Sequence, residues 1–354
     1  YTDQTRLDGR KFMHRTSFVF LLSAMLAGGI GAARADVTLF GHLDQSWVAV
    51  DQDGGNDDQF LECTTCSVGF KGSEDLGNGL RAIFKLDFQF DMNNRNANGS
   101  LTDRDQWLGM SSSFGQVRVG TISTVYKSHG AALDPLYRTS QQGRDRGLQS
   151  NLHRGAGSAG QGRAENTARY DSPSWNGLKF AATYTLVPDD NTTTDDNGYG
   201  AGISYENGGI LVFADYITND SDDDDSAWKV GGKYTFNNFA FMGQYERDDG
   251  LISSKASNTS GDGADIWHLG ASYTLGNSML YFGYGNGSSG SGGSNSSDYF
   301  AWTLAGVHNM SKRTSLYAGF SEIDCDDPGD DVCRRVGSDG GEDDKFSVGM
   351  KHKF

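Results

Sequence analysis

Charged side chains recur at every second position of several apolar segments, and they are the residues of this sequence best suited to bind or guide ions. In the clearest segment, Leu80 and Leu86 share one parity while Arg81 and Lys85 share the other. A strand places alternate side chains on opposite faces, so the charges of one segment lie together. If the apolar face meets hydrocarbon, a basic residue there would cost about 2–4 kcal/mol, which fixes the charged face toward water. The residues assigned to that face are Lys71, Arg81, Lys85, Asp87, Arg118, Arg163, Glu165, Arg169 and Lys179.

A second group of charges lies in residues 121–162, a glycine-containing connection without clear strand alternation. A connection this long in a compact fold is usually functional or disordered. It carries basic Lys127, Arg138, Arg144, Arg146 and Arg154, acidic Asp134 and Asp145, and two histidines, His129 and His153. Together with the basic strand face, this excess of cations predicts an opening with a mild preference for anions. The alternative is that the arginines of this connection face outward, toward solvent or a neighbouring subunit.

Four cysteines form two close pairs, Cys63 with Cys66 and Cys325 with Cys333. In an exported protein an even number of loop cysteines predicts disulfides, and metal binding is the weaker alternative. Acidic runs at 51–58, 222–225 and 324–331 could hold Ca²⁺ loosely through carboxylate oxygens. None of these runs has EF-hand spacing, so solvated loops are the plainer interpretation. No cofactor is expected.

Motifs for catalysis are missing from the sequence. It contains no strict Gly-x-Ser-x-Gly, no phosphate-binding Gly-rich loop before a helix and no His-Glu-x-x-His. The seven histidines are scattered along the chain. The sequence therefore predicts a protein that is not an enzyme.

The elements that must position these charges are strands, because a period of two dominates from residue 36 onward. Tight turns such as 77–79 and 207–209 alternate with long polar connections such as 51–65, 188–197 and 248–262. Short connections on one rim and long ones on the other are typical of bacterial outer-membrane barrels. Sixteen strands are predicted, which makes the fold an all-β, 16-stranded antiparallel transmembrane β-barrel. Their expected starts are near residues 37, 67, 80, 105, 116, 163, 178, 198, 210, 227, 239, 264, 278, 298, 314 and 344.

Residues 1–35 are interpreted as a leader. Met13 and Arg15 precede an apolar stretch at 18–30, and Ala33-Arg34-Ala35 resembles a cleavage site, which is the order of a secretory signal peptide. Residues 1–12 are interpreted as an upstream artefact, and residues 36–354 as the barrel domain. The whole chain has a net charge of −16, and residues 36–354 alone hold 25 basic and 44 acidic residues, or −19. Such a balance argues against nucleic acid as a partner.

Four strings, the last of them at the chain end, resemble the general porin family of Gram-negative bacteria, especially its trimeric members. The strings are VTLFG at 37–41, GFKGSEDLGNGL at 69–80, NTARYDSP at 166–173 and VGMKHKF at 348–354. The resemblance implies a water-filled outer-membrane channel for passive diffusion of ions and small hydrophilic solutes, with the long third loop folded into the lumen. It also implies a homotrimer in contact with lipopolysaccharide and outer-membrane lipid. Phe354 would be the terminal aromatic residue that the barrel-assembly machinery reads.

One departure from the family pattern concerns the end of the fifth strand. Many relatives have Gly-Arg-Gln there, whereas this chain has Gly120-Thr121-Ile122. A basic residue of the constriction is therefore missing or is replaced by a neighbour such as Arg118. Ion preference thus cannot be transferred from the resemblance. A substrate-selective channel for anions or organic acids, an outer-membrane adhesin and a secreted soluble β-protein remain as alternatives.

Overall fold

The computed structural model describes residues 35–52, 57–93, 101–153, 162–186, 197–219, 226–248, 251, 264–289, 297–325 and 341–354. Seventeen strands and one α-helix, α1 (Val125–Leu133), are assigned within these ranges. The strands are β1 (Ala35–Gln52), β2 (Asp58–Cys63), β3 (Ser67–Gly77), β4 (Leu80–Gln89), β5 (Thr102–Ser112), β6 (Gly115–Ser123), β7 (Arg163–Asp171), β8 (Leu178–Thr185), β9 (Gly198–Asn207), β10 (Ile210–Asn219), β11 (Ser226–Phe236), β12 (Phe239–Asp248), β13 (Ala264–Leu275), β14 (Ser278–Ser289), β15 (Ser297–Asn309), β16 (Thr314–Cys325) and β17 (Glu342–Lys353).

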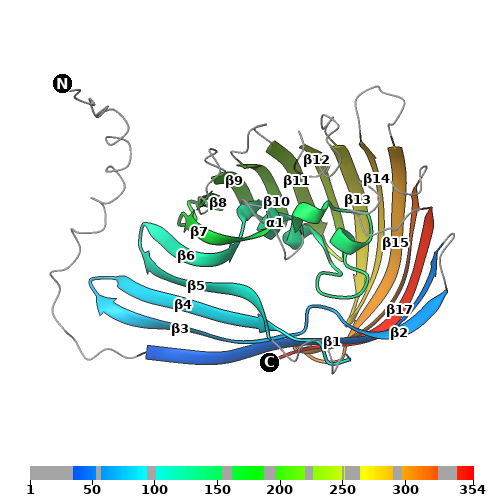
Figure 1. Ribbon diagram of the computed structural model, residues 1–354, viewed down its shortest axis with the longest axis horizontal. Coiled ribbons are helices and arrows are strands. Elements are labelled where there is room, and N and C mark those ends of the chain that lie inside the picture. Colours follow the sequence, from blue (N-terminus) through cyan, green and yellow to red (C-terminus); the bar gives the residue numbers. More distant parts are fainter. Residues whose placement is uncertain are drawn as a thin grey trace, which may run out of the picture.

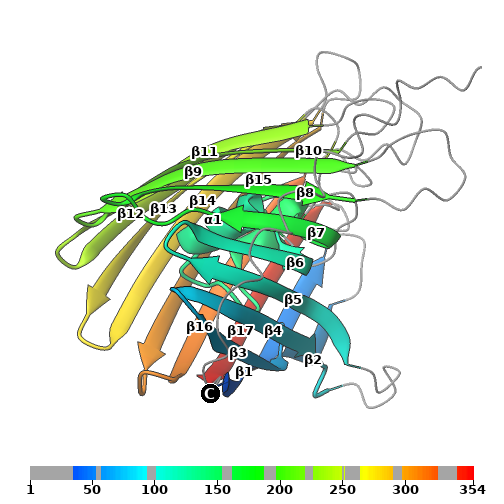
Figure 2. The same cartoon turned by 90° about the vertical axis from the view of Figure 1, so that its left-hand side faces the viewer.

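The strands form one closed antiparallel barrel. Each pairs with its sequence neighbour, and β17 closes the ring on β1 in a register that runs from His42 opposite Lys353 to Gln52 opposite Asp343. β2 and β3 together make one barrel strand, since both pair with β1 and are separated only by residues 64–66. The barrel therefore has sixteen strands, and the predicted fold class is confirmed. Closure joins the first strand of the sheet to the last one (Figures 1 and 2).

The predicted strand starts lie within three residues of the observed ones. The prediction was wrong at one place, where residues 51–65 were assigned to a single long connection. In the structure Asp58–Cys63 is β2, which extends the second barrel strand beyond the bulge at residues 64–66. The tight turn at 77–79 is confirmed, and Asn78 there has a φ of 53°. A positive φ of this kind is one that Asn tolerates better than most residues.

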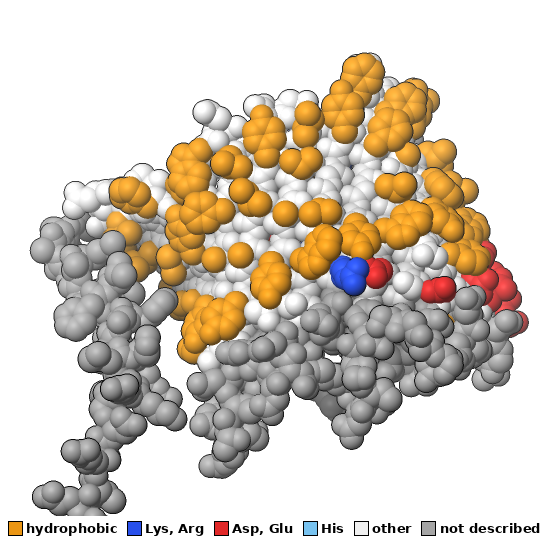
Figure 3. Space-filling view, turned by 90° about the horizontal axis from the view of Figure 1, so that it is seen from above, with side chains coloured by type: hydrophobic (Ala, Val, Ile, Leu, Met, Phe, Trp, Pro, Cys, Tyr) orange, Lys and Arg blue, Asp and Glu red, His pale blue; other side chains and the backbone are white. Residues whose placement is uncertain are grey.

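The outer wall is apolar and the inner face is polar. Large side chains such as Leu86, Phe180, Trp228 and Phe282 are exposed around the outside of the barrel, and Figure 3 shows apolar side chains spread over one outer face. In the membrane these side chains contact lipid or other apolar surfaces. None of the helices among the described residues is long and apolar enough to cross a membrane.

The hydrophobic core lies inside the barrel, between the wall and the chain segment that follows β6. One buried cluster joins Tyr126, Leu148 and Leu152 of this segment to Ile217 and Ile266 of the wall. A second joins Leu133 and Leu136 to wall residues that include Phe213 and Tyr281. Burial of this kind stabilises the segment against the wall by roughly 1.5–3 kcal/mol for each fully buried large side chain.

Candidate pore constriction

The connection between β6 and β7 folds into the barrel. Residues 124–153 of it are described, and we call them the lumen loop. The loop begins with α1, whose first turn is capped by Thr124: its Oγ1 accepts a hydrogen bond from the backbone N–H of Lys127 at 3.3 Å. α1 lies inside the ring of strands, against β8–β12 (Figure 1).

The second half of the lumen loop lies against β14–β17. The hydroxyl of Tyr299 on β15 donates to the carbonyl of Gly147 at 2.9 Å. The Oγ of Ser140 donates to the Oγ of Ser347 on β17 at 2.8 Å. The loop is thus attached to two separate parts of the wall and crosses the interior of a barrel that is too wide for side chains alone to fill.

Arg146 and Arg144, which were predicted to line the pore, are buried in this structure and bonded to other parts of the fold. The Arg146 guanidinium is 2.9 Å from Asp343 Oδ1 and donates to Ser321 Oγ at 2.7 Å. Arg144 donates to the carbonyl of His153 at 3.0 Å. Both side chains are buried within the fold. Neither faces outward from the barrel, and Arg154 lies outside the described residues.

Asp134 and Asp145 have local roles in the loop. The two carboxylate oxygens of Asp134 accept the backbone N–H groups of Leu136 and Gly143, each at 2.9 Å. Burial raises the pKa of Asp134 to about 6. Asp145 accepts a short hydrogen bond from the side chain of Gln142. Asp134 therefore closes a turn of the loop.

A cluster of cations and carboxylates lies where the lumen loop approaches β4, β5 and β7. Asp87 is 1% exposed, and its Oδ2 lies 3.3 Å from Arg104 Nε and 3.5 Å from Lys85 Nζ. Arg138 of the loop has its Nη2 3.9 Å from the same oxygen. Asp105 has Arg163 at 2.8 Å and Lys85 at 3.0 Å. We call the six residues the constriction cluster: Lys85, Asp87, Arg104, Asp105, Arg138 and Arg163. It contains four cations and two carboxylates.

Arg104 and Asp105 were not predicted as site residues. The β4–β5 register shifts between Leu86 and Phe88, and this bulge allows two consecutive residues of β5 to reach lumen-facing partners. Strict alternation would place them on opposite faces, so the pattern could not have identified both.

A neighbouring group joins Arg118, Arg169 and Asp171. Arg169 Nη2 lies 2.7 Å from Asp171 Oδ1, and Arg118 forms a short ion pair with the same carboxylate. Arg169 also donates to Ser128 Oγ on α1 at 3.0 Å, which ties the wall to the loop. Arg118 lies over the ring of Trp107 at 5.1 Å.

The remaining predicted wall residues are more exposed. The ammonium groups of Lys71 and Lys85 each lie 5.6 Å from the ring centre of Phe40, inside the barrel. Arg81 donates to Ser73 Oγ at 2.5 Å near a tight turn. Lys179 is exposed beside α1. Glu165 is exposed next to Asn166, whose φ is 49° at a second register shift, and it is not part of the constriction cluster.

A buried polar network holds α1 and the end of the lumen loop to β10–β12. Lys229 is 0% exposed, with its Nζ 2.8 Å from His153 Nε2 and 3.7 Å from Asp215 Oδ2. Glu246 accepts the hydroxyls of Tyr126 at 2.9 Å and Ser150 at 2.7 Å. We call these six residues the anchor network: Tyr126, Ser150, His153, Asp215, Lys229 and Glu246.

Sequence reasoning missed the function of the anchor network. The sequence does indicate that Lys229 and Asp215 face the lumen, since each lies between apolar neighbours on a strand. Within the loop, burial, and to a lesser extent the charge of Lys229, holds the pKa of His153 well below its usual range. Burial, with nearby Arg144 and Arg163, likewise holds the pKa of Lys127 well below its usual range.

The described cysteines lie on two barrel strands. Cys63 and Cys66 are joined by a disulfide at the bulge between β2 and β3. Cys325, at the end of β16, is also disulfide-bonded, and Cys333 lies outside the described residues. At the chain end, the backbone of Phe354 exchanges hydrogen bonds with Gly41 at 3.0 and 3.2 Å, which completes the closure of the barrel.

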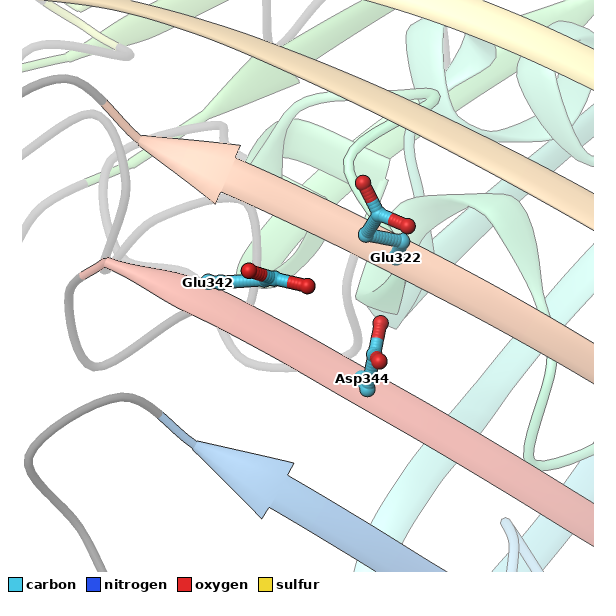
Figure 4. A group of neighbouring side chains, drawn as sticks. All are labelled: Glu322, Glu342 and Asp344. Carbon is cyan, nitrogen blue, oxygen red and sulfur yellow. The ribbon is translucent and has the colours of Figure 1, made fainter.

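One acidic group on the barrel brings three carboxylates together. Oxygens of Glu322, Glu342 and Asp344 lie within 4.8 Å of one another on β16 and β17 (Figure 4). They are exposed or half-buried, and such groups are common without a bound ion. The acidic run at 222–225, residues 53–56 of the run at 51–58, and residues 326–331 of the run at 324–331 lie outside the described residues.

Comparison with known proteins identifies the family. A family model described as Gram-negative porin matches residues 22–328. The major outer membrane protein P.IB of Neisseria meningitidis serogroup A is 27% identical over 357 residues, which cover 94% of this chain and 99% of that protein. An outer membrane porin protein of Bordetella pertussis is 26% identical and covers 84% of this chain and 92% of its own length.

Solved structures agree. An anion-selective porin from Comamonas acidovorans superposes with a TM-score of 0.73 at 23% identity and covers 91% of this chain and 100% of its own. Salmonella typhi OmpF, in complex with daunomycin, gives a TM-score of 0.71 at 17% identity, with coverage of 90% and 97%. The chain therefore belongs to the Gram-negative porin family, and it is an integral outer-membrane barrel that acts as a non-enzymatic channel for passive diffusion.

Proposed function

We propose that the narrowest part of the channel lies between Arg138 of the lumen loop and the β4–β5 wall, and that it prefers anions. The observation that carries the proposal is the composition of the constriction cluster, where four cations share two carboxylates. The local charge is +2, although the whole chain carries −16. Low-dielectric walls focus the field of such a cluster into the opening, so the local charge dominates the distant acidic loops.

Diffusion through this opening needs no cofactor and no conformational cycle. Arg138 is half-buried, and its distance of 3.9 Å from Asp87 leaves its charge incompletely paired. Arg104 is more deeply buried and holds Asp87 in place. In this arrangement Arg104 neutralises the wall carboxylate, and Arg138 supplies the field that a passing anion meets.

Reversal potentials across a planar bilayer test the proposal. In a tenfold KCl gradient, the reversal potential of the purified protein is expected to have the sign that indicates anion preference. A unit charge about 6 Å from the permeating ion contributes about 0.7 kcal/mol in water. The charge attracts an anion and repels a cation by this amount, a difference of about 1.4 kcal/mol between the two ions. Arg138→Gln should therefore lower the anion-to-cation permeability ratio about tenfold, whereas Arg81→Gln, near a tight turn, should change it little. Cation preference of the unaltered protein would refute the proposal, and the Comamonas anion-selective porin provides a reference channel.

We also propose that the chain forms a homotrimer and that its mature form begins at Asp36. Porins are typically trimeric, and a trimer form is among the solved structures with this fold. The exposed apolar outer wall offers surface for subunit contact as well as for lipid and lipopolysaccharide. Phe354 would serve the barrel-assembly machinery as its recognition signal. Intact mass of the protein from outer membranes, before and after heating in detergent, tests the first residue and the subunit number.

A further inference from the structure

A small cavity lies between α1 and the wall strands β7–β9, beside the diffusion path. It has a volume of about 60 Å³ and is partly open. Val125 and His129 of α1 form one side of it, and Arg169, Lys179 and Ser204 are among the wall residues that form the other. It is separate from the constriction cluster, none of whose residues lines it.

The cavity carries an excess of positive charge. Its one acidic lining residue, Asp171, is shared between Arg169 and Arg118. Lys179 forms no ion pair within the described part of the chain and is exposed. With Arg118 on the neighbouring strand β6, three cations thus lie at or beside the cavity with one carboxylate. An excess of this kind attracts an anion, and an ammonium group offers three hydrogen-bond donors to its oxygens.

His129 is held in place at the same cavity. Its Nδ1 lies 2.7 Å from Asp215 Oδ1, and its ring stacks on Phe213 with 5.0 Å between ring centres. With Nδ1 engaged, Nε2 is the nitrogen that remains for a ligand. Arg169 is also fixed, because it donates to the backbone carbonyl of Ser123 at 2.6 Å as well as to Asp171. The cavity is therefore preorganised, and binding would require ordering of little more than Lys179.

The volume limits the size of the ligand. One water molecule needs about 10–15 Å³ of such space, so 60 Å³ admits about four to six non-hydrogen atoms. Acetate and inorganic phosphate fall in this range.

We propose that this cavity binds one small oxyanion, of the size of acetate or phosphate, with Lys179 as its main charge partner. The site would hold the anion transiently beside the diffusion path and would give the channel saturable behaviour toward small oxyanions. The proposal goes beyond the ion preference of the constriction and does not depend on it, because saturable binding and reversal potential are measured separately.

Isothermal titration of the purified full-length protein with sodium phosphate, and separately with sodium acetate, at constant ionic strength tests the proposal. Saturable binding of either anion with one site per chain is expected. Lys179→Met should weaken the affinity at least tenfold. Ser204→Leu should weaken it similarly, because it fills the cavity without changing the charge.

Lys233→Met is the matched control, since Lys233 lies on β11 beside the same helix, with its Nζ 3.2 Å from the carbonyl of Ala132, but does not line the cavity. It should change the affinity less than twofold. The proposal is overturned if neither anion binds saturably, if Lys179→Met binds like the unaltered protein, or if Lys233→Met loses as much affinity as Lys179→Met. Should Ser204→Leu fail to fold, the two lysine variants still decide the outcome.

Discussion

Replacing Lys229 by Met should release the lumen loop from the wall without opening the barrel. Lys229 is fully buried and is the cation between Asp215 and His153, and its Nζ also donates to the carbonyl of Tyr126 on α1. Removing one partner of a buried pair costs about 3–5 kcal/mol, because the other charge is left uncompensated. Since 1.4 kcal/mol corresponds to a factor of ten, the detached loop should become about 10²–10³ times more populated. The barrel itself is held by its strand ladders, which this change does not touch.

Hydrogen exchange of the amides in residues 125–153 measures this change directly. Exchange of these amides should become about 10²–10³ times faster in Lys229→Met, while the amides of β13–β16 keep their protection. Single-channel records should show more frequent steps between current levels. Lys233→Met is the control, because Lys233 makes one contact with the loop and is less buried. Equal exchange in the variant and the unaltered protein would refute the assignment of the anchor network as the loop's main attachment.

Two further outcomes are expected. The folded-state pKa of His153 is depressed, so its contribution to loop attachment is complete above the unfolded pKa of 6.5 and is lost as the pH falls below that value. Fluctuations of the single-channel current should therefore rise between pH 7 and pH 5, and His153→Gln should remove most of that rise. An unchanged pH profile in the variant would contradict the role assigned to His153. Replacing Cys63 and Cys66 by Ser should lower the free energy of unfolding by only about 2 kcal/mol, because the loop that the disulfide closes is four residues long. Urea unfolding measures this free energy. A loss well above 4 kcal/mol would show that the disulfide does more than restrict the unfolded chain.

The barrel can be predicted from the sequence because lipid lies outside it and water inside it. Along every strand, alternate residues must therefore be apolar and polar. Trp228 and Val230 must face outward, so Lys229 must face inward, and the structure agrees. β2 escaped prediction because Asp58–Cys63 lacks clean alternation. The bulge between β4 and β5 hid Arg104 for a related reason, since one extra residue breaks the parity on which the prediction depends.

The interior contacts could not be predicted because they join residues far apart along the chain. Tyr126 and Glu246 are separated by 120 positions, and Arg146 and Asp343 by 197. A run of loop arginines therefore predicts positive charge inside the lumen but not which arginine meets a carboxylate. The structure pairs Arg146 with Asp343 and places Arg138 3.9 Å from Asp87, where we propose the opening.

Chemical modification of a cysteine at position 138 tests most directly whether the opening lies between the lumen loop and β4–β5. The described cysteines are all disulfide-bonded. Arg138→Cys therefore supplies a free thiol that can react with a bulky, water-soluble, thiol-reactive sulfonate. Reaction should reduce the single-channel current by a large fraction, whereas the same treatment of Leu86→Cys, whose side chain faces outward, should leave the current unchanged. An unchanged current after complete modification at position 138 would contradict this location of the constriction.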